Sequence, residues 1–230
     1  MTALVVGTRP SPVAVKICGL TRPVDAEHAE RSGAAYLGAI LASGPRLLTP
    51  ERARAVLGAR RAGIQRVAVF GDQSFDALLA LAESIDLDVL QLHGASSPDS
   101  VRRLVAESGR TVWPVVRVAG TALPAEAAPL ADAAGHLVLD ALVLGQLGGT
   151  GVALDWAGLA ESVAALRTAV PDVRIILAGG LRPHNVAEAI RLLSPDVVDV
   201  SSGVEAAPGL KDGTLVQQFV AAAQGAAEMG

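Results

Sequence analysis

Val173-Arg174-Ile175-Ile176-Leu177-Ala178-Gly179-Gly180 is a short, almost continuously apolar run that ends in a pair of glycines. Apolar residues on both faces of a strand are typical of a parallel sheet that is covered by helices. A helical pattern follows, and the same pair of elements repeats along the chain. We expect strands near 13–17, 35–41, 65–70, 88–92, 112–117, 136–140, 174–178 and 197–200. We expect helices near 23–32, 50–61, 74–84, 97–107, 124–133, 156–168, 183–193 and 212–224.

Eight strand–helix units in 230 residues fit a closed (β/α)8 TIM barrel better than an open doubly wound sheet. We therefore predict an α/β protein with one barrel domain over 13–230, preceded by an N-terminal extension over 1–12 that has no catalytic role. Prolines in Thr49-Pro50, Ser97-Pro98 and Arg182-Pro183 predict the starts of three helices. Active sites of such barrels lie at the C-terminal ends of the strands. The polar residues expected at those ends are Cys18, Gln91, His93, Arg117, Asp140, Asp199 and Ser201.

Composition narrows the class of partner. The net charge is −4, and the arginines are scattered instead of clustering with aromatic residues, which argues against a nucleic-acid interface. No apolar run reaches the length that spans a bilayer, and Thr2 to Gly7 lacks the features of a signal peptide. A single cysteine agrees with a reducing compartment. We expect a cytoplasmic protein, a monomer or homodimer, that acts on a small molecule and not on nucleic acid or membrane.

Cys18 and Asp140 are the candidate catalytic residues. Alternation along the first strand points Lys16 and Cys18 to the same face, and an ammonium group beside a thiol favours the thiolate, whereas burial of either group opposes it. The alternative for Cys18 is a small buried hydrophobic residue. Asp140 ends an apolar strand across the mouth, where a partly desolvated carboxyl group can hold a proton and donate it. Its alternative is a cap for the following loop.

Two segments have the composition of phosphate-binding loops. Gly179-Gly180 follows the seventh strand and Ser201-Ser202-Gly203 follows the eighth, which is where barrels often bind phosphate. Glycines allow close approach of backbone N–H groups to an anion, and serine hydroxyls add donors. A plain turn would also explain either segment. A third cluster, Gly148-Gly149-Thr150-Gly151, could close over a ligand or could be a flexible connection.

The sequence indicates no metal and no cofactor. Only His93 of the four histidines reaches the expected mouth, where a lone histidine is more often a hydrogen-bonded structural residue than a ligand. The Gly-x-Gly-x-x-Gly, Walker and Gly-x-Ser-x-Gly motifs are absent from the sequence.

Taken together, these motifs resemble the N-(5′-phosphoribosyl)anthranilate isomerase family of tryptophan biosynthesis, from Lys16 to about Phe219. The matching segments are Lys-Ile-Cys-Gly-Leu-Thr-Arg at 16–22, Gln-Leu-His-Gly at 91–94, Gly-Gly-Thr-Gly at 148–151, Asp155-Trp156, Leu-Ala-Gly-Gly-Leu-Arg-Pro-His-Asn-Val at 177–186, Asp-Val-Ser-Ser-Gly-Val-Glu at 199–205, Pro208-Gly209 and Lys211-Asp212.

The resemblance implies an Amadori rearrangement by general acid–base catalysis. It makes Cys18 the base that removes the sugar C2 proton, Asp140 the acid that protonates the ring oxygen, and Arg46 the residue that holds the anthranilate carboxylate. Without the resemblance, Arg46 would be a solvated loop charge. The residues expected to bind substrate are Arg46, Gly179, Gly180, Asp199, Ser201, Ser202 and Gly203.

Two departures from the family pattern lie near the expected mouth. The usual Gly-Phe segment reads Gly38-Ala39, and the common Val-Asn after the third strand reads Phe70-Gly71-Asp72. The smaller Ala39 predicts a looser aryl pocket. Two other functions stay open. One is the histidine-pathway phosphoribosyl isomerase, a family whose site has two aspartates where this chain has Cys18 and Asp140. The other is a non-catalytic barrel that binds a phosphorylated metabolite.

Overall fold

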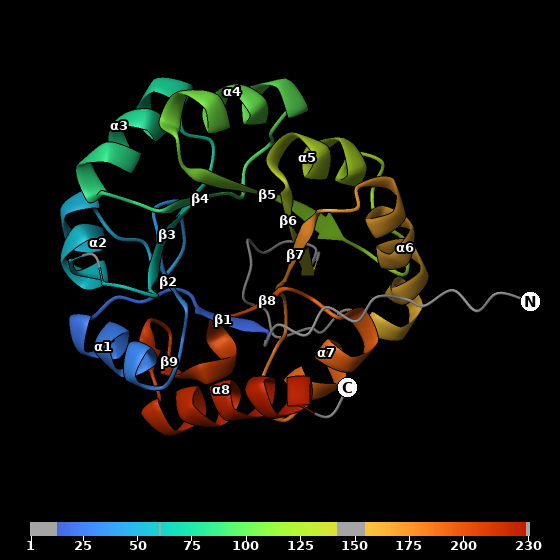
Figure 1. The fold of residues 1–230 in the computed structure, drawn as a ribbon. Coiled ribbons are helices and arrows are strands. Elements are labelled where there is room, and N and C mark those ends of the chain that lie inside the picture. Colours follow the sequence, from blue (N-terminus) through green and yellow to red (C-terminus); the bar gives the residue numbers. More distant parts are fainter. Residues whose placement is uncertain (1–12, 60, 142–154, 229–230) are drawn as a thin grey trace, which may run out of the picture.

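Eight short apolar segments form parallel strands that close into a barrel in chain order, β1 to β8, with the helices around it (Figure 1). The structure is a computed structural model that describes residues 13–59, 61–141 and 155–228. The barrel strands are β1 Ala14–Ile17, β2 Tyr36–Ile40, β3 Gln65–Phe70, β4 Val89–Leu92, β5 Thr111–Val118, β6 His136–Ala141, β7 Arg174–Leu177 and β8 Val197–Val200. The helices are α1 Pro23–Arg31, α2 Pro50–Leu57, α3 Phe75–Ile85, α4 Pro98–Ser108, α5 Ala127–Ala134, α6 Trp156–Ala169, α7 Val186–Leu193 and α8 Gly213–Glu228. The predicted (β/α)8 barrel is confirmed.

Closure depends on β1, which pairs with β2 on one side and with β8 on the other. The register places Lys16 opposite Tyr36 of β2 and opposite Asp199 of β8. Because side chains alternate along a strand, this register turns Lys16 and Asp199 to the same face. The two ends of the barrel sequence therefore meet at the base of the predicted site.

Side-chain hydrogen bonds explain where several helices begin. Thr49 and Ser97 cap α2 and α4 as the prolines predicted, and Ser97 exchanges hydrogen bonds with Ser100 in a capping box. The predicted start of α7 at 183 is wrong, because the Asn185 side chain accepts from the Arg182 N–H at 2.7 Å and donates to the Gly180 carbonyl at 3.1 Å. These bonds hold 182–185 as a loop, so α7 begins at Val186.

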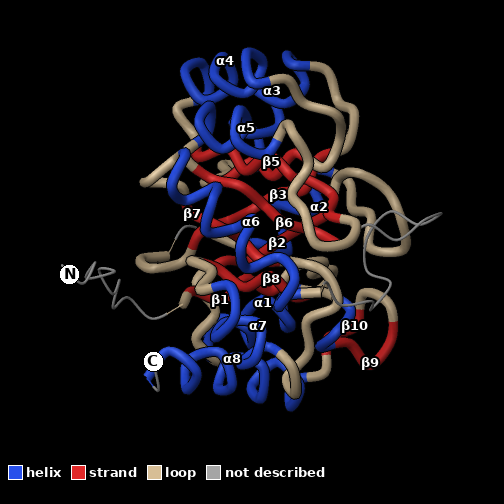
Figure 2. Tube along the Cα trace, turned by 90° about the vertical axis from the view of Figure 1, so that its right-hand side faces the viewer, coloured by secondary structure: helices blue, strands red, loops and turns tan. Residues whose placement is uncertain are grey.

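A small hairpin after β8 is an element that the sequence prediction missed. Strands β9 Glu205–Ala207 and β10 Leu210–Lys211 pair antiparallel around Pro208-Gly209, after the short 3-10 helix η1 Ser202–Val204. Pro-Gly is a strong turn signal, but strands this short carry little periodicity. Figure 2 shows the hairpin standing at one end of the barrel, beyond the barrel strands.

Two apolar cores stabilise the fold, one inside the barrel and one between barrel and helices. Trp113 fills the interior, with its ring centroid 5.0 Å from that of Tyr36. Ala39 is fully buried in the outer core, and Ile40 lines the mouth instead. The expectation that Ala39 loosens an aryl pocket is therefore wrong, because alternation along β2 turns Ala39 toward the helices. No helix in the described ranges is long and apolar enough to cross a membrane.

The outer position of Ala39 can be tested by restoring the family's larger side chain. We expect Ala39→Phe to lower the free energy of unfolding by about 1–3 kcal/mol, because an extra ring must fit between barrel and helices. The Michaelis constant should stay unchanged. Urea unfolding measures the effect, and Ala55→Phe on the exposed face of α2 is the matched control, with a change under about 0.5 kcal/mol. A raised Michaelis constant without loss of stability would place Ala39 at the mouth.

Candidate functional site

The residues predicted from the sequence meet in one cavity of about 530 Å³ at the C-terminal end of the barrel. The predicted catalytic and substrate-binding residues that line it are Cys18, Arg46, Asp140, Gly179, Gly180, Asp199, Ser201, Ser202 and Gly203, and the predicted strand-end residues Gln91 and His93 line it too. They come from different strand ends and loops that are distant in sequence. Arg117 pairs in register with Asp140 but is not part of the cavity lining.

A buried ion pair forms the floor of this cavity. The Lys16 ammonium group is fully buried, and it donates to Asp199 Oδ2 at 2.7 Å and to Gln91 Oε1 at 2.9 Å. Burial alone would lower the pKa of Lys16, but the Asp199 carboxylate and the Cys18 thiol outweigh it and raise that pKa. Lys16 therefore stays charged below Cys18. The other carboxylate oxygen, Asp199 Oδ1, is buried and has no hydrogen-bond partner within the described part of the chain.

Cys18 lies above this pair in a nearly closed environment. Burial raises the pKa of the Cys18 thiol, the Lys16 charge opposes this rise, and Asp199 adds to it. The pKa of Cys18 is raised overall, so burial outweighs the Lys16 charge, which the sequence alone did not establish. In the free protein Cys18 is consequently a neutral thiol at neutral pH, and it must lose its proton before it can act as a base.

Asp140 ends β6 on another wall of the cavity. His93 Nε2 lies 3.2 Å from Asp140 Oδ2, so this histidine is a polar partner of the carboxyl group. The backbone at Gly179 packs against the opposite side: a Cβ atom there would lie 3.0 Å from Asp140 Oδ1 and 2.6 Å from the Ala141 nitrogen. With φ at +88°, this position requires glycine. Asp140 thus lies between His93, the residue after β4, and the loop after β7.

The two candidate phosphate loops pack directly on each other. A Cβ atom at Gly203 would overlap the Leu181 carbonyl oxygen, so only glycine allows the two loops to meet. Ser201 Oγ is buried, and the described residues offer it no hydrogen-bond partner. Buried polar atoms without partners are rare in folded proteins and mark places where a ligand or water completes the bonding. The loops therefore form one polar wall of the cavity.

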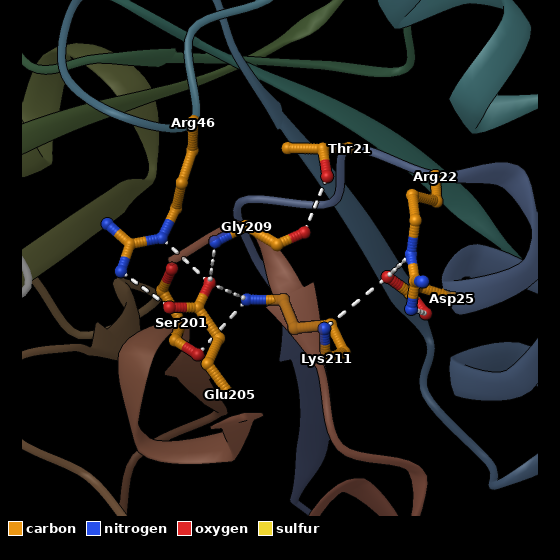
Figure 3. Close-up of polar contacts among 8 residues, drawn as sticks. All are labelled: Thr21, Arg22, Asp25, Arg46, Ser201, Glu205, Gly209 and Lys211. Atoms are coloured by element: carbon orange, nitrogen blue, oxygen red, sulfur yellow. Dashed lines mark hydrogen bonds and ion pairs between the residues drawn. The ribbon is translucent and has the colours of Figure 1, made fainter. Parts of the chain in front are cut away.

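Arg46 reaches the rim from the loop between β2 and α2. Its Nε and Nη2 atoms donate to the two Glu205 carboxylate oxygens at 2.7 and 2.6 Å. Lys211 approaches the same carboxylate at 2.8 Å (Figure 3). The sequence prediction assigned no role to Glu205 or Lys211, although both stand in the segments that carry the family resemblance.

Other sequence motifs do not add to the described site. The cluster Gly148-Gly149-Thr150-Gly151 and residues 1–12 lie outside the described residues. Where the structure describes the chain, no three His, Cys, Asp or Glu side chains are grouped so that they could hold a metal ion. A second hollow of about 560 Å³ lies on the outside, near α2, but its buried cation Arg66 is already paired with Asp86 at 2.7 Å.

The model of the family described as N-(5'phosphoribosyl)anthranilate (PRA) isomerase matches residues 15–222. The chain belongs to this family. An N-(5′-phosphoribosyl)anthranilate isomerase from Rubrobacter xylanophilus is 41% identical over 213 residues, which is 91% of this chain and 98% of the relative.

Solved structures of the family agree with the fold. Phosphoribosyl anthranilate isomerase from Thermus thermophilus superposes with a TM-score of 0.75 at 36% identity, over 91% of this chain and 98% of that one. A second family structure, in complex with reduced 1-(o-carboxyphenylamino)-1-deoxyribulose 5-phosphate, superposes with a TM-score of 0.74 at 30% identity, over 93% and 99% of the two chains.

The protonation state of Cys18 can be measured by alkylation, because it is the only cysteine in the sequence. Its pKa is raised, so the thiolate fraction at pH 7 is small and grows as the pH increases. We expect the iodoacetamide reaction, followed by mass spectrometry, to accelerate roughly tenfold per pH unit between pH 7 and 9. Alkylation of the urea-unfolded chain provides the reference. A rate that is already constant at pH 7 would show a stable thiolate.

Proposed function

We propose that this chain catalyses the isomerisation for which its family is named, the conversion of N-(5′-phosphoribosyl)anthranilate to 1-(2-carboxyphenylamino)-1-deoxyribulose 5-phosphate in tryptophan biosynthesis. One observation carries the proposal: a thiol and a carboxyl group line the same cavity as two glycine-rich loops of the kind that bind phosphate. This arrangement offers one base, one acid and an anchor for a phosphorylated sugar. The match of the family model over 15–222 supports it.

In the first step Asp140 donates its proton to the ring oxygen of the sugar. The bond between this oxygen and C1 breaks, and the nitrogen lone pair forms the C=N bond of a protonated Schiff base. General acid catalysis of this kind needs a proton donor within hydrogen-bond reach of the leaving oxygen. The His93 contact at Oδ2 and the Gly179 backbone beside Oδ1 restrict the orientation of the Asp140 carboxyl group toward the cavity.

In the second step the Cys18 thiolate removes the proton from C2. The electron pair of that C–H bond forms a double bond between C1 and C2, and the C=N electrons return to nitrogen. The resulting enol loses its hydroxyl proton and gains a proton at C1, which yields the ketone. The Lys16 charge beneath Cys18 favours the thiolate but does not outweigh burial in the free protein, so the thiol first loses its proton to solvent and then accepts the proton from C2.

The two ends of the substrate fit the two polar regions of the cavity. Backbone N–H groups at Gly179, Gly180, Ser202 and Gly203, together with the Ser201 hydroxyl, would hold the phosphate. Arg46 would hold the anthranilate carboxylate by charge-assisted hydrogen bonds. The reacting carbons then lie between these anchors, where Cys18 and Asp140 face the cavity.

The chemistry of the site also separates the alternatives. Cys18 occupies a position where the histidine-pathway isomerase would have an aspartate. A non-catalytic barrel would have no need of both an acid and a base in the cavity. We infer a cytoplasmic monomer or homodimer. The homologous enzyme from Thermotoga maritima is described as dimeric.

Removing the acid or the base should abolish most of the turnover. We expect Cys18→Ala and Asp140→Asn each to lower kcat by roughly 10²-fold or more, as general acid–base groups do. The assay generates phosphoribosylanthranilate in situ, and the histidine-pathway substrate serves as the comparison, which the wild type should not convert. Circular dichroism controls for folding. Turnover near that of wild type in either variant would remove that residue from the mechanism.

Removing the guanidinium group should weaken binding more than chemistry. We expect Arg46→Ala to raise KM by about 10- to 100-fold, the usual loss for a hydrogen-bonded charge, with a smaller effect on kcat. Inhibition by inorganic phosphate is the control, because the phosphate loops keep their residues. An unchanged KM would assign the carboxylate to a different residue.

A further inference from the structure

The hairpin β9–β10 brings a carboxylate against the rim arginine. Glu205 opens β9, and its two oxygens accept from Nε and Nη2 of Arg46 at 2.7 and 2.6 Å, which is a bidentate pair (Figure 3). The side chains are only 12% exposed for Arg46 and 4% for Glu205. Such a shielded and planar contact restricts the guanidinium to one orientation, unlike a pair on an open surface.

Lys211, from β10, holds the same carboxylate from another side. Its ammonium group donates to Glu205 Oε1 at 2.8 Å and to the Ser201 carbonyl at 3.1 Å, and the Gly209 N–H donates to Oε1 at 3.2 Å. Burial favours a protonated Glu205, but the hydrogen bonds and charges of Arg46 and Lys211 outweigh it, so the pKa of Glu205 is lowered. Glu205 is therefore a carboxylate at neutral pH.

The charges in this cluster do not cancel. With Lys211 in its ammonium form, Arg46, Lys211 and Glu205 together carry one net positive charge. Nearby Asp25 is matched by its own partner, Arg22, at 2.6 and 2.9 Å. The remaining positive charge belongs to a cluster that lines the substrate cavity through Arg46.

The orientation of Arg46 leaves part of its donor set available. A guanidinium group has five N–H donors, and Glu205 uses one on Nε and one on Nη2. Nη1 points away from Glu205 in Figure 3. A second carboxylate can therefore bind the Nη1 side while Glu205 keeps the other edge.

We propose that Glu205 is a positioning residue, which holds Arg46 in the orientation that accepts the aryl carboxylate before the substrate arrives. The inference rests on the proposed function, because it assumes that Arg46 binds this carboxylate. A long side chain that is ordered in advance loses less conformational freedom on binding. Lys211 connects the Glu205 carboxylate to the Ser201 backbone, so the hairpin links the carboxylate end of the site to the phosphate loop.

A double-mutant cycle tests this role. We expect Glu205→Gln to raise KM for phosphoribosylanthranilate about tenfold and to leave kcat within about threefold, because a neutral amide cannot accept both Arg46 hydrogen bonds. In an Arg46→Ala background the same change should raise KM by less than about twofold. Inhibition by inorganic phosphate should stay within about twofold in all variants. Glu107→Gln, which breaks an exposed ion pair on α4, is the matched control and should leave KM and kcat unchanged.

The outcomes separate the two proposals. If Arg46→Ala leaves KM unchanged, the proposed carboxylate site fails, whatever Glu205 does. If Arg46→Ala raises KM but Glu205→Gln has no effect, or has the same effect in the Arg46→Ala background, Glu205 does not act through Arg46 and the positioning role is overturned.

A second variant covers the case in which Glu205→Gln does not fold. Arg46→Lys keeps the charge but removes the planar, two-pronged contact with Glu205. We expect it to raise KM about as much as Glu205→Gln does, with kcat again within about threefold. Urea unfolding midpoints establish that each variant is folded. A KM equal to that of the wild type in Arg46→Lys would show that the bidentate contact is not needed, and would overturn the proposal.

Discussion

A lysine ammonium group inside a barrel must be matched by buried partners, and much of this site follows from that requirement. Lys16 lies on β1, and its partners come from β4 and β8. An unpaired charge at this depth would cost several kcal/mol, roughly 3–5 kcal/mol when one partner of a buried pair is removed. The side chains of these three strands therefore have to meet at one point inside the barrel. Because β1 and β8 are also the strands that close the barrel, the same contact that satisfies the charge marks the point where the fold is completed.

The same ion pair influences the chemistry above it. Cys18 is two residues after Lys16 and faces the same side, so the ammonium group acts on the thiol while burial opposes ionisation. The result is a thiol whose ionisation depends closely on its surroundings. Asp140, by contrast, lies between His93 and the Gly179 backbone. Base and acid thus lie in the same cavity but have different neighbours.

The walls of the cavity are built from loops that stabilise one another. The loops after β7 and β8 touch at Gly203 and Leu181, where no Cβ atom fits. The hairpin after η1 then extends this contact to the rim, because Lys211 bonds the Ser201 carbonyl and Glu205 bonds Arg46. One continuous segment from Asp199 to Lys211 therefore contributes to the floor, the phosphate wall and the rim. Its short elements contain few residues that could signal this from periodicity.

The sequence by itself determined the number and order of the eight barrel strands and their helices, because apolar runs and helix caps are local patterns. It also placed Cys18, Asp140 and the glycine loops at strand ends, where the barrel rule brings them together. Tertiary structure alone decided that Ala39 faces the outer core and that Glu205 and Lys211 surround Arg46. It also decided that burial outweighs Lys16 in its effect on Cys18. These features depend on which face a side chain takes and on how many charges share a desolvated volume. Both quantities arise only when distant segments pack.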